Sequence, residues 1–434
     1  MKRITGRAVS VLLLAVCLLL GAALFVLRYT SEGRDWALFY SRANAGAGGE
    51  LTDRNGVVLA SFDTVRSAFA EDAATRIACF HVTGDYWNRT GTGALSMYWD
   101  DMQDYDILEG TSSSEPKQLR LTIDASLCRA AYRAIGTGRK GAVMMMNYRT
   151  GEVLVMVSAP STDPIDGEAA IQEGTFINRC LSATYTPGSV FKLVTAAAAI
   201  ETIPQLYDLH FTCEGVYPIG SVDITCSGTH GEESFSQALA DSCNASFAQI
   251  TVRTGYAAMA EHVKAYGFVD RQDLDGIPAI AGHYWEEHPG DAELAWSGIG
   301  QSTDLVCPYT LLRFVAAIAN DGILCTPRLL MTDDPPVETR LVAAETAGKL
   351  KELMRYTARV SYAPSVNFPG VYGLCAKTGT AELGNGTSHA WFTGFLDDPA
   401  HPYAFVVLIE RGGGGLAQAG VAANTLLQAA LSQG

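Results

Sequence analysis

Three short patterns in the chain carry side chains that could do chemistry together. In chain order they are Ser189–Lys192 (S-x-x-K), Ser242–Asn244 (S-x-N) and Lys377–Thr380 (K-T-G-T). A serine hydroxyl becomes a good nucleophile only when a nearby base takes its proton. A lysine can be that base if it is neutral, and apolar burial or a neighbouring cation favours the neutral form. The patterns therefore indicate a serine nucleophile activated by a lysine.

The first pattern stands at a predicted helix start. A Pro-Gly turn precedes Ser189, and apolar residues at helical spacing follow it. Residues three apart share one face of a helix, so we expect Lys192 beside Ser189, in apolar surroundings and with Lys377 as the second cation. For a lone S-x-x-K pattern, the alternative is a capping serine and a surface lysine.

The second pattern is predicted to lie in a loop between two helical stretches. There the hydroxyl of Ser242 can relay a proton, and the amide of Asn244 can bind a substrate. An ordinary helix break is the alternative.

The third pattern lies on a predicted strand. Gly379 has no Cβ, which lets another backbone approach closely. Lys377 and the hydroxyls of Thr378 and Thr380 suit a carboxylate. A free strand edge would also accept an extended peptide by strand addition. A plain β-turn is the alternative.

Two further matches to these patterns are set aside. Ser114–Lys117 also reads S-x-x-K, but it contains Pro116 and lies in a linker by composition, Glu109–Gln118. Ser365–Asn367 also reads S-x-N, but it lies in a loop between two prolines.

The elements that must position the three patterns form an α/β arrangement. Residues 141–160 predict two apolar strands joined at Arg149–Gly151. Helices are expected from Ser189 and through most of 233–320, followed by three strands within 371–410 and a last helix near 417–431. This order indicates an antiparallel sheet flanked by helices, with a mainly helical subdomain. The first and last thirds of this region must then meet in space.

The N-terminal segment predicts a membrane anchor. Lys2, Arg3 and Arg7 precede twenty uncharged residues, and Arg28 follows them. This length spans a bilayer, whereas the apolar core of a cleaved signal peptide, the alternative, is shorter. Because positive charge stays inside, we expect a single-pass protein of the cell membrane whose remaining chain is extracytoplasmic. The net charge of −15 argues against a nucleic-acid-binding protein, which would need a basic surface.

Ten cysteines are present without a C-x-x-C pair. Cys213 and Cys226 flank a Gly- and Pro-containing stretch, and an exported chain can form a disulfide there. Two unpaired buried thiols are the alternative. A zinc site that also used His230 would still lack a fourth ligand, so no metal is expected.

Together the three patterns resemble those of class B penicillin-binding proteins. The stretches "TPGSVFK", "DSCNASF", "SGIGQ", "KTGTAE", "HAWFTGF" and "LTIDASL" carry the resemblance, and "GELTDRNGVVLA" resembles the start of that family's N-terminal module. The resemblance implies an anchor at 1–28, a small non-catalytic module and linker at 29–118, and a penicillin-binding/β-lactamase-like transpeptidase domain at 119–434.

The resemblance also implies an activity, that of a D,D-transpeptidase which cross-links peptidoglycan stem peptides and binds penicillin covalently. Ser189 would form the acyl-enzyme, Lys192 would accept its proton, and Ser242 with Lys377 nearby would protonate the leaving D-alanine. The substrate site would consist of Asn244, Thr378, Gly379 and Thr380, and the backbone N–H groups of Ser189 and Thr380 would form the oxyanion hole.

Partners follow from the same resemblance. Residues 29–118 are too few for a glycan-polymerising domain, so a SEDS-type membrane polymerase is the expected partner, and no cofactor is expected. A β-lactamase, a β-lactam sensor and a catalytically silent scaffold of the division or elongation machinery stay open as alternatives. The β-lactamase is disfavoured because no E-x-x-L-N run lies between Asn244 and Lys377. The sensor is disfavoured because one predicted span and a short cytoplasmic tip leave little of the chain to transmit a signal. The silent scaffold is disfavoured because the three patterns are intact.

Overall fold

The computed structural model describes residues 2–43, 48–62, 67–102, 105–106, 110–111, 117–166, 171–363 and 373–433. Its α-helices are α1 (Lys2–Ala43), α2 (Ala73–Thr83), α3 (Ala94–Met97), α4 (Trp99–Met102), α5 (Ala125–Ile135), α6 (Lys192–Thr202), α7 (Phe235–Ala240), α8 (Asn244–Thr254), α9 (Tyr256–Ala265), α10 (Asp291–Gly298), α11 (Pro308–Ala319), α12 (Ala344–Thr357) and α13 (Val421–Leu431). Its strands are β1 (Gly49–Thr52), β2 (Val58–Phe62), β3 (Ser67–Phe69), β4 (Tyr105–Asp106), β5 (Gly110–Thr111), β6 (Lys117–Arg120), β7 (Gly141–Asn147), β8 (Val153–Ala159), β9 (His210–Cys213), β10 (Val216–Ile219), β11 (Val222–Thr225), β12 (Gly231–Ser234), β13 (Gln272–Leu274), β14 (Ile277–Ala279), β15 (Ile323–Cys325), β16 (Glu338–Arg340), β17 (Leu374–Glu382), β18 (Ser388–Leu396) and β19 (Tyr403–Ile409).

The chain divides into two compact units. The smaller unit comprises Met1–Glu50, Ser61–Ala68 and Asp100–Gln118, and the larger comprises Leu51–Ala60, Phe69–Trp99 and Leu119–Gly434. This division does not follow the predicted boundary at 118/119, because parts of the upstream region belong to the larger unit. Arg76, for example, forms a salt bridge of 2.7 Å with Asp163. The assignment of residues 29–118 to a separate module stays a prediction. Of the linker predicted at 109–118, residues 109 and 112–116 lie outside the described part of the chain.

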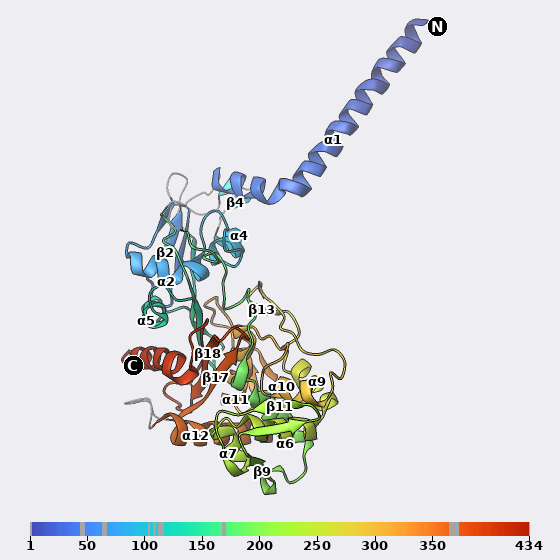
Figure 1. The fold of residues 1–434 in the computed structure, drawn as a ribbon. Coiled ribbons are helices and arrows are strands. Elements are labelled where there is room, and N and C mark those ends of the chain that lie inside the picture. The colour runs from blue at the N-terminus through green and yellow to red at the C-terminus, as the bar shows by residue number, and fades with distance from the viewer. Residues whose placement is uncertain are drawn as a thin grey trace. The chain divides into compact units, whose positions relative to one another are not determined.

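The apolar N-terminal segment forms the long helix α1 (Figure 1). Within it, Arg7–Arg28 comprises 22 residues with a mean hydropathy of 2.9, and none of this stretch is buried. At a rise of 1.5 Å per residue, a helix of this length can cross the hydrocarbon core of a bilayer. The helix thus fits the predicted anchor in length and composition.

The larger unit is built on a five-stranded sheet in the order β17-β18-β19-β7-β8 (Figure 1). All four neighbouring pairs are antiparallel. The central pair joins β19 to β7, with Tyr403 opposite Asn147 and Ile409 opposite Gly141. The prediction that the first and last parts of this region meet in an antiparallel sheet is therefore confirmed.

Helices cover the sheet. Nearly every residue of β7, β8, β18 and β19 is buried, and because successive side chains of a strand point to opposite faces, both faces of these strands are covered. α11 packs against β7, β18 and β19, whereas α5 packs against β7 and β8, and α13 packs against α5 and β19. The K-T-G-T strand, β17, is an edge strand of this sheet.

The mainly helical subdomain lies between β8 and β17 in sequence. Its helix α6 packs against α8, α9 and α12. The sequence patterns did not predict two short strand pairs in this region, β9 with β12 and β10 with β11. Another missed pair, β13 with β14, interrupts the stretch predicted to be helical. Its turn is Asp275-Gly276, both at positive φ, which is the dipeptide that favours a tight hairpin.

The packing of α10 on α8 yields a stability prediction. A Cβ at Gly298 would lie 1.9 Å from Oγ1 of Thr251, so Gly298→Ala must push the two helices apart. We expect a loss of about 1–3 kcal/mol in the free energy of unfolding, as for other overpacked cores. Denaturant titration of the full chain in detergent measures it.

Gly348→Ala is the matched control. Gly348 lies inside α12, and nothing lies within 4 Å of the added Cβ. Replacing an unhindered helix glycine by alanine should raise the stability by about 0.5–1 kcal/mol. Equal effects of the two substitutions would contradict the packing argument.

Candidate active site

Ser189 lies on a turn that leads into α6. Gly188–Val190 form a 3₁₀ turn, and Phe191 joins it to α6, which begins at Lys192. The predicted helix start is confirmed, with a 3₁₀ first turn. Side chains three residues apart eclipse each other in such a turn, so Ser189 and Lys192 share one side of it. Ser189 is half-buried, whereas Lys192 is fully buried.

The side chains of the first and third patterns meet at Ser242. Nζ of Lys192 donates to the carbonyl oxygen of Ser242 at 2.5 Å, to its Oγ at 3.3 Å and to Oδ1 of Asn244 at 2.8 Å. Nζ of Lys377 donates to the same Oγ at 2.8 Å and to the carbonyl oxygen of Thr378 at 3.2 Å. Three patterns separated by up to 188 positions in the sequence (Ser189 to Lys377) are thus joined through one hydroxyl.

The loop that carries Ser242 is a tight break between α7 and α8, as predicted. Ser242 has a φ of +55°, a left-handed conformation that few non-glycine residues adopt and that is concentrated at functional sites. Cys243 caps α8, and Asn244 is the first residue of that helix. Nδ2 of Asn244 donates to the carbonyl oxygen of Thr225 at 2.9 Å, which fixes the amide while its oxygen faces Lys192.

Burial sets the protonation of the two lysines. Burial lowers the pKa of Lys192 to about 8, although interactions with Cys243, Cys226 and Glu233 oppose this shift. Burial also holds the pKa of Lys377 well below its usual range, and the positive charge of Lys192 lowers it further. At least one of the two ammonium groups can therefore lose its proton near neutral pH, as lysine base chemistry requires.

Close backbone approach joins the Ser189 turn to β17. A Cβ at Gly188, where φ is +56°, would lie 2.7 Å from the carbonyl oxygen of Thr380. A Cβ at Gly379 would lie 2.8 Å from the carbonyl oxygen of Pro187. Nε1 of Trp391 on β18 donates to the carbonyl oxygen of Thr186 at 3.0 Å and holds the turn in place. The expectation that Gly379 permits close approach is confirmed.

The free edge of β17 faces the site. Among the described residues, β18 is its only strand partner. The N–H of Thr378 donates instead to the hydroxyl of Tyr362 at 2.9 Å, and that hydroxyl lies 3.1 Å from Oγ1 of Thr378. Thr380 is exposed, and its Oγ1 accepts from the N–H of Gly415 at 3.2 Å. The edge is thus exposed at Thr380, where it can accept an extended peptide, whereas the hydroxyl of Tyr362 occupies the N–H of Thr378.

Sequence reasoning missed Tyr362 and Gly415, and neither has a local pattern that signals a contact with β17. It did find Lys192, Ser242, Asn244 and Lys377, which hydrogen bonds join in the structure, and Ser189, which lies on the turn that leads into α6. Both discarded patterns include residues outside the described part of the chain: Ser114 and the whole of 365–367.

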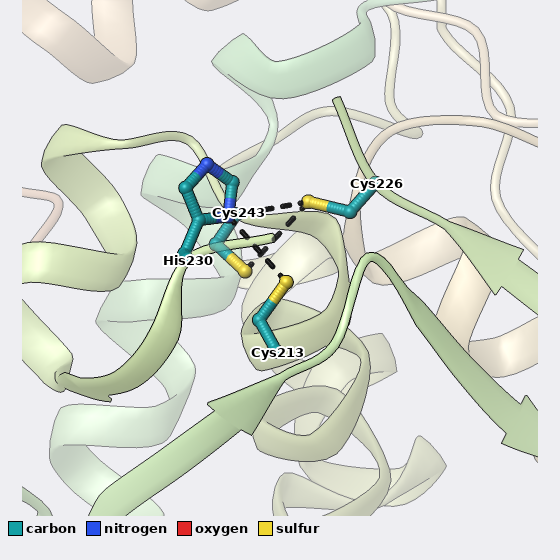
Figure 2. Close-up of side chains that lie close together, drawn as sticks. All are labelled: Cys213, Cys226, His230 and Cys243. Carbon is teal, nitrogen blue, oxygen red and sulfur yellow. Dashed lines mark hydrogen bonds between the residues drawn. The ribbon is translucent and has the colours of Figure 1, made fainter. Parts of the chain in front are cut away.

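The predicted disulfide is not present in the structure. Cys213 and Cys226 are free thiols, as are the other eight cysteines. Their sulfur atoms both lie near Nδ1 of His230, at 3.4 and 3.5 Å (Figure 2). The expectation that a fourth ligand is missing was wrong, because the loop between α7 and α8 returns Cys243 to this cluster.

Comparisons with known proteins agree with this geometry. The family model "Penicillin binding protein transpeptidase domain" matches residues 141–431. The chain is 31% identical to "Peptidoglycan D,D-transpeptidase PbpA" of Mycolicibacterium smegmatis, over 69% of this chain and 68% of the relative, and 30% identical to the protein of that name from Mycobacterium tuberculosis, again over 69% and 68%. A solved structure of penicillin-binding protein A from M. tuberculosis, a ceftriaxone acyl-enzyme complex, matches with a TM-score of 0.77 and 25% identity, covering 89% of this chain and 99% of that one.

Proposed function

Because this chain belongs to the penicillin-binding protein transpeptidase family, we propose that it is a class B member, a serine D,D-transpeptidase that cross-links peptidoglycan stem peptides. The observation that carries the proposal is the meeting of Lys192 and Lys377 at the hydroxyl of Ser242, beside the Ser189 turn and the open edge of β17. This arrangement supplies a base, a proton relay and a place for a peptide.

In the proposed acylation, the donor stem peptide lies along the edge of β17. Asn244 holds its amide, and the hydroxyls of Thr378 and Thr380 hold its terminal carboxylate, with Gly379 leaving room for the backbone. Neutral Lys192 takes the proton of Ser189 as its Oγ attacks the carbonyl carbon between the two D-alanines. The N–H groups of Ser189 and Thr380 stabilise the oxyanion, and each such donor typically contributes about 2.7–4 kcal/mol.

The tetrahedral intermediate then expels the terminal D-alanine. Its nitrogen takes a proton from the hydroxyl of Ser242, which is replenished from the ammonium of Lys192 or Lys377, both within 3.3 Å of that oxygen. The amine of a second stem peptide attacks the ester on Ser189 and loses a proton to the lysine that the previous step left neutral. That proton returns to Oγ of Ser189 as the C–O bond breaks and the serine is released. β-Lactams take the place of the donor peptide and leave a stable ester.

Ser189 is the acylated residue in this proposal. Intact-mass analysis of the full chain after penicillin treatment should show a single adduct, which Ser189→Ala abolishes because no other serine among the described residues has a buried lysine base on the same turn. The adduct should persist for hours, since a β-lactamase would hydrolyse it. An adduct on Ser114, Ser242 or Ser365, or the absence of any adduct, would reject the assignment.

Lys192 acts as the base in this proposal. Lys192→Arg keeps the positive charge but cannot become neutral, so the acylation rate should fall by about 10²–10⁴-fold. In the unsubstituted chain about one tenth of Lys192 is neutral at pH 7, given its pKa of about 8, so the rate should rise roughly tenfold per pH unit below 8 and level off above it. Stopped-flow labelling with a fluorescent penicillin measures both effects.

Lys349→Arg is the control for this substitution. Lys349 is partly exposed on α12 and pairs with Glu345 rather than with Ser242 or Asn244. Its replacement should leave the rate and the pH profile unchanged. Near-normal acylation in Lys192→Arg, or a rate independent of pH between 6 and 9, would exclude Lys192 as the base.

The proposal places the enzyme in the cell membrane, with α1 retained as a single-pass anchor and the catalytic unit on the extracytoplasmic side. It also names a SEDS-type polymerase as the partner that supplies glycan strands. Mild detergent extraction of native membranes tests both statements. The purified chain should begin at Met1 or Lys2 and carry the polymerase with it. A mature N-terminus near Gly46 would refute the anchor, and extraction without a polymerase would refute the partnership.

A further inference from the structure

Three cysteines and one histidine converge beside the loop that carries Ser242. The sulfur atoms of Cys213, Cys226 and Cys243 and a ring nitrogen of His230 all lie within 4.8 Å of one another. Figure 2 shows the four side chains pointing toward a common centre. The mechanism proposed above uses none of these four side chains, so the cluster needs a separate explanation.

We propose that the cluster binds one Zn²⁺ ion as a Cys₃His site. Zinc bonds of about 2.3 Å to sulfur and 2.0–2.1 Å to nitrogen place tetrahedral ligand atoms about 3.5–3.8 Å apart. Cys213 Sγ and Cys226 Sγ lie 3.4 and 3.5 Å from Nδ1 of His230, and Cys226 Sγ lies 3.8 Å from Cys243 Sγ. Three thiols and an imidazole favour zinc over magnesium or calcium, which prefer oxygen ligands.

The surroundings of the sulfur atoms suit metal-bound thiolates. The N–H of Asn244 donates to Cys226 Sγ at 3.3 Å, and the N–H of Ser246 donates to Cys243 Sγ at 3.4 Å. Such bonds stabilise negative sulfur and orient it, as outer-shell groups of metal sites do. Cys213 and Cys243 are fully buried, whereas Cys226 and His230 are partly exposed, which leaves a route for the ion from solvent.

A buried carboxylate supplies a second observation. Glu233 is 2% exposed, and its Oε2 accepts from the hydroxyl of Ser246, the residue whose N–H contacts Cys243. Its other oxygen, Oε1, is buried and has no hydrogen-bond partner in the described part of the chain. Burying a negative charge is costly unless it is compensated. Lys192 interacts with this carboxylate and provides part of that compensation, and a divalent cation in the neighbouring cluster would add to it.

Three of the four ligands come from short strand pairs that pack against α8, and the fourth, Cys243, caps that helix. Cys213 ends β9, whose one strand partner in the described part of the chain is β12, the strand that follows His230. Cys226 follows the two-stranded hairpin β10–β11, and its N–H donates to the carbonyl oxygen of Gly215 at 2.9 Å. Isolated strand pairs are marginal in water. A zinc ion would join both pairs to the start of α8.

One consequence reaches the site described above and rests on the proposed function. Cys243 lies between Ser242 and Asn244, the residues that contact Lys192. An ion bound to Cys243 would hold this loop in its left-handed turn and keep the Ser242 hydroxyl within reach of both lysines. Zinc would act here as a positioning metal with no contact to the reacting atoms.

Metal analysis of the full chain in detergent tests the site directly. Protein purified without chelators or a histidine tag should contain about one zinc ion per chain by elemental analysis. Cys213→Ser and Cys243→Ser should lose the metal, whereas Cys325→Ser, a buried free cysteine outside the cluster, should keep it. A metal-free protein that does not take up added Zn²⁺, or full zinc content in Cys243→Ser, would overturn the proposal.

Cobalt substitution tests the site in the unsubstituted chain, without any variant. Co²⁺ exchanged into the unsubstituted chain should give thiolate-to-metal charge-transfer bands and the intense visible bands of a tetrahedral ion, with the thiols protected from alkylation. An octahedral cobalt spectrum would overturn the site. A mapped disulfide between Cys213 and Cys226 in the native protein would do so as well.

Removal of the metal tests the positioning role separately. Chelation should lower the melting temperature and slow acylation by fluorescent penicillin at least tenfold, and added Zn²⁺ should restore both. Unchanged acylation in metal-free protein would overturn the positioning role. The zinc content and the cobalt spectrum do not depend on acylation. A chain that binds zinc but never reacts with penicillin would therefore refute the proposed function and support the metal site.

Discussion

The larger unit is organised around one constraint: two lysine ammonium groups are buried together and donate hydrogen bonds to the same hydroxyl. Lys192 and Lys377 are both fully buried, and both donate to Oγ of Ser242. Burying one lysine is expensive, and burying two together adds repulsion. The oxygen atoms of Ser242, Asn244 and Thr378 recover part of this cost by accepting hydrogen bonds. The remaining cost of burial lowers the pKa values of both lysines. The same burial therefore favours the neutral lysine that can act as a base.

Such an arrangement can exist only if three distant elements are held rigidly. α6 carries Lys192, the break between α7 and α8 carries Ser242, and β17 carries Lys377. β17 is fixed by nine paired positions along β18. The Ser189 turn packs so closely against its neighbours that only glycine fits at three positions. A Cβ at Gly188 or Gly379 would lie under 3 Å from backbone atoms across the contact between the turn and β17, and a Cβ at Gly300 would lie under 3 Å from the backbone of Gly188. These glycines set the distance between the Ser189 turn and Thr380, on which the proposed oxyanion hole depends.

Much of this could be predicted from the sequence because the signals are long or chemically distinct. The strands at 141–159 and 374–409 have seven to nine residues each, and those of β7, β8, β18 and β19 are mostly apolar. Lys192, Ser242 and Lys377 stand in recognisable patterns. The strands β9 to β14 have only three or four residues each, too few for a period to emerge above chance. Tyr362 could not be predicted because its role is a tertiary contact with the N–H of Thr378. The left-handed conformation of Ser242 could not be predicted either, because serine has no preference for it.

Cys243 shows most clearly why the rest could not be predicted. In the S-x-N pattern the middle position carries no chemistry, so the pattern assigns no role to a cysteine there. The turn at Ser242 gives the three residues different surroundings: Ser242 and Asn244 contact Lys192, whereas the sulfur of Cys243 caps α8 and lies 3.8 Å from that of Cys226. The same backbone conformation that presents the hydroxyl to two lysines thus places the sulfur in the cysteine–histidine cluster. Any change in that turn must move both, which couples the cluster to the proposed chemistry through a single residue step.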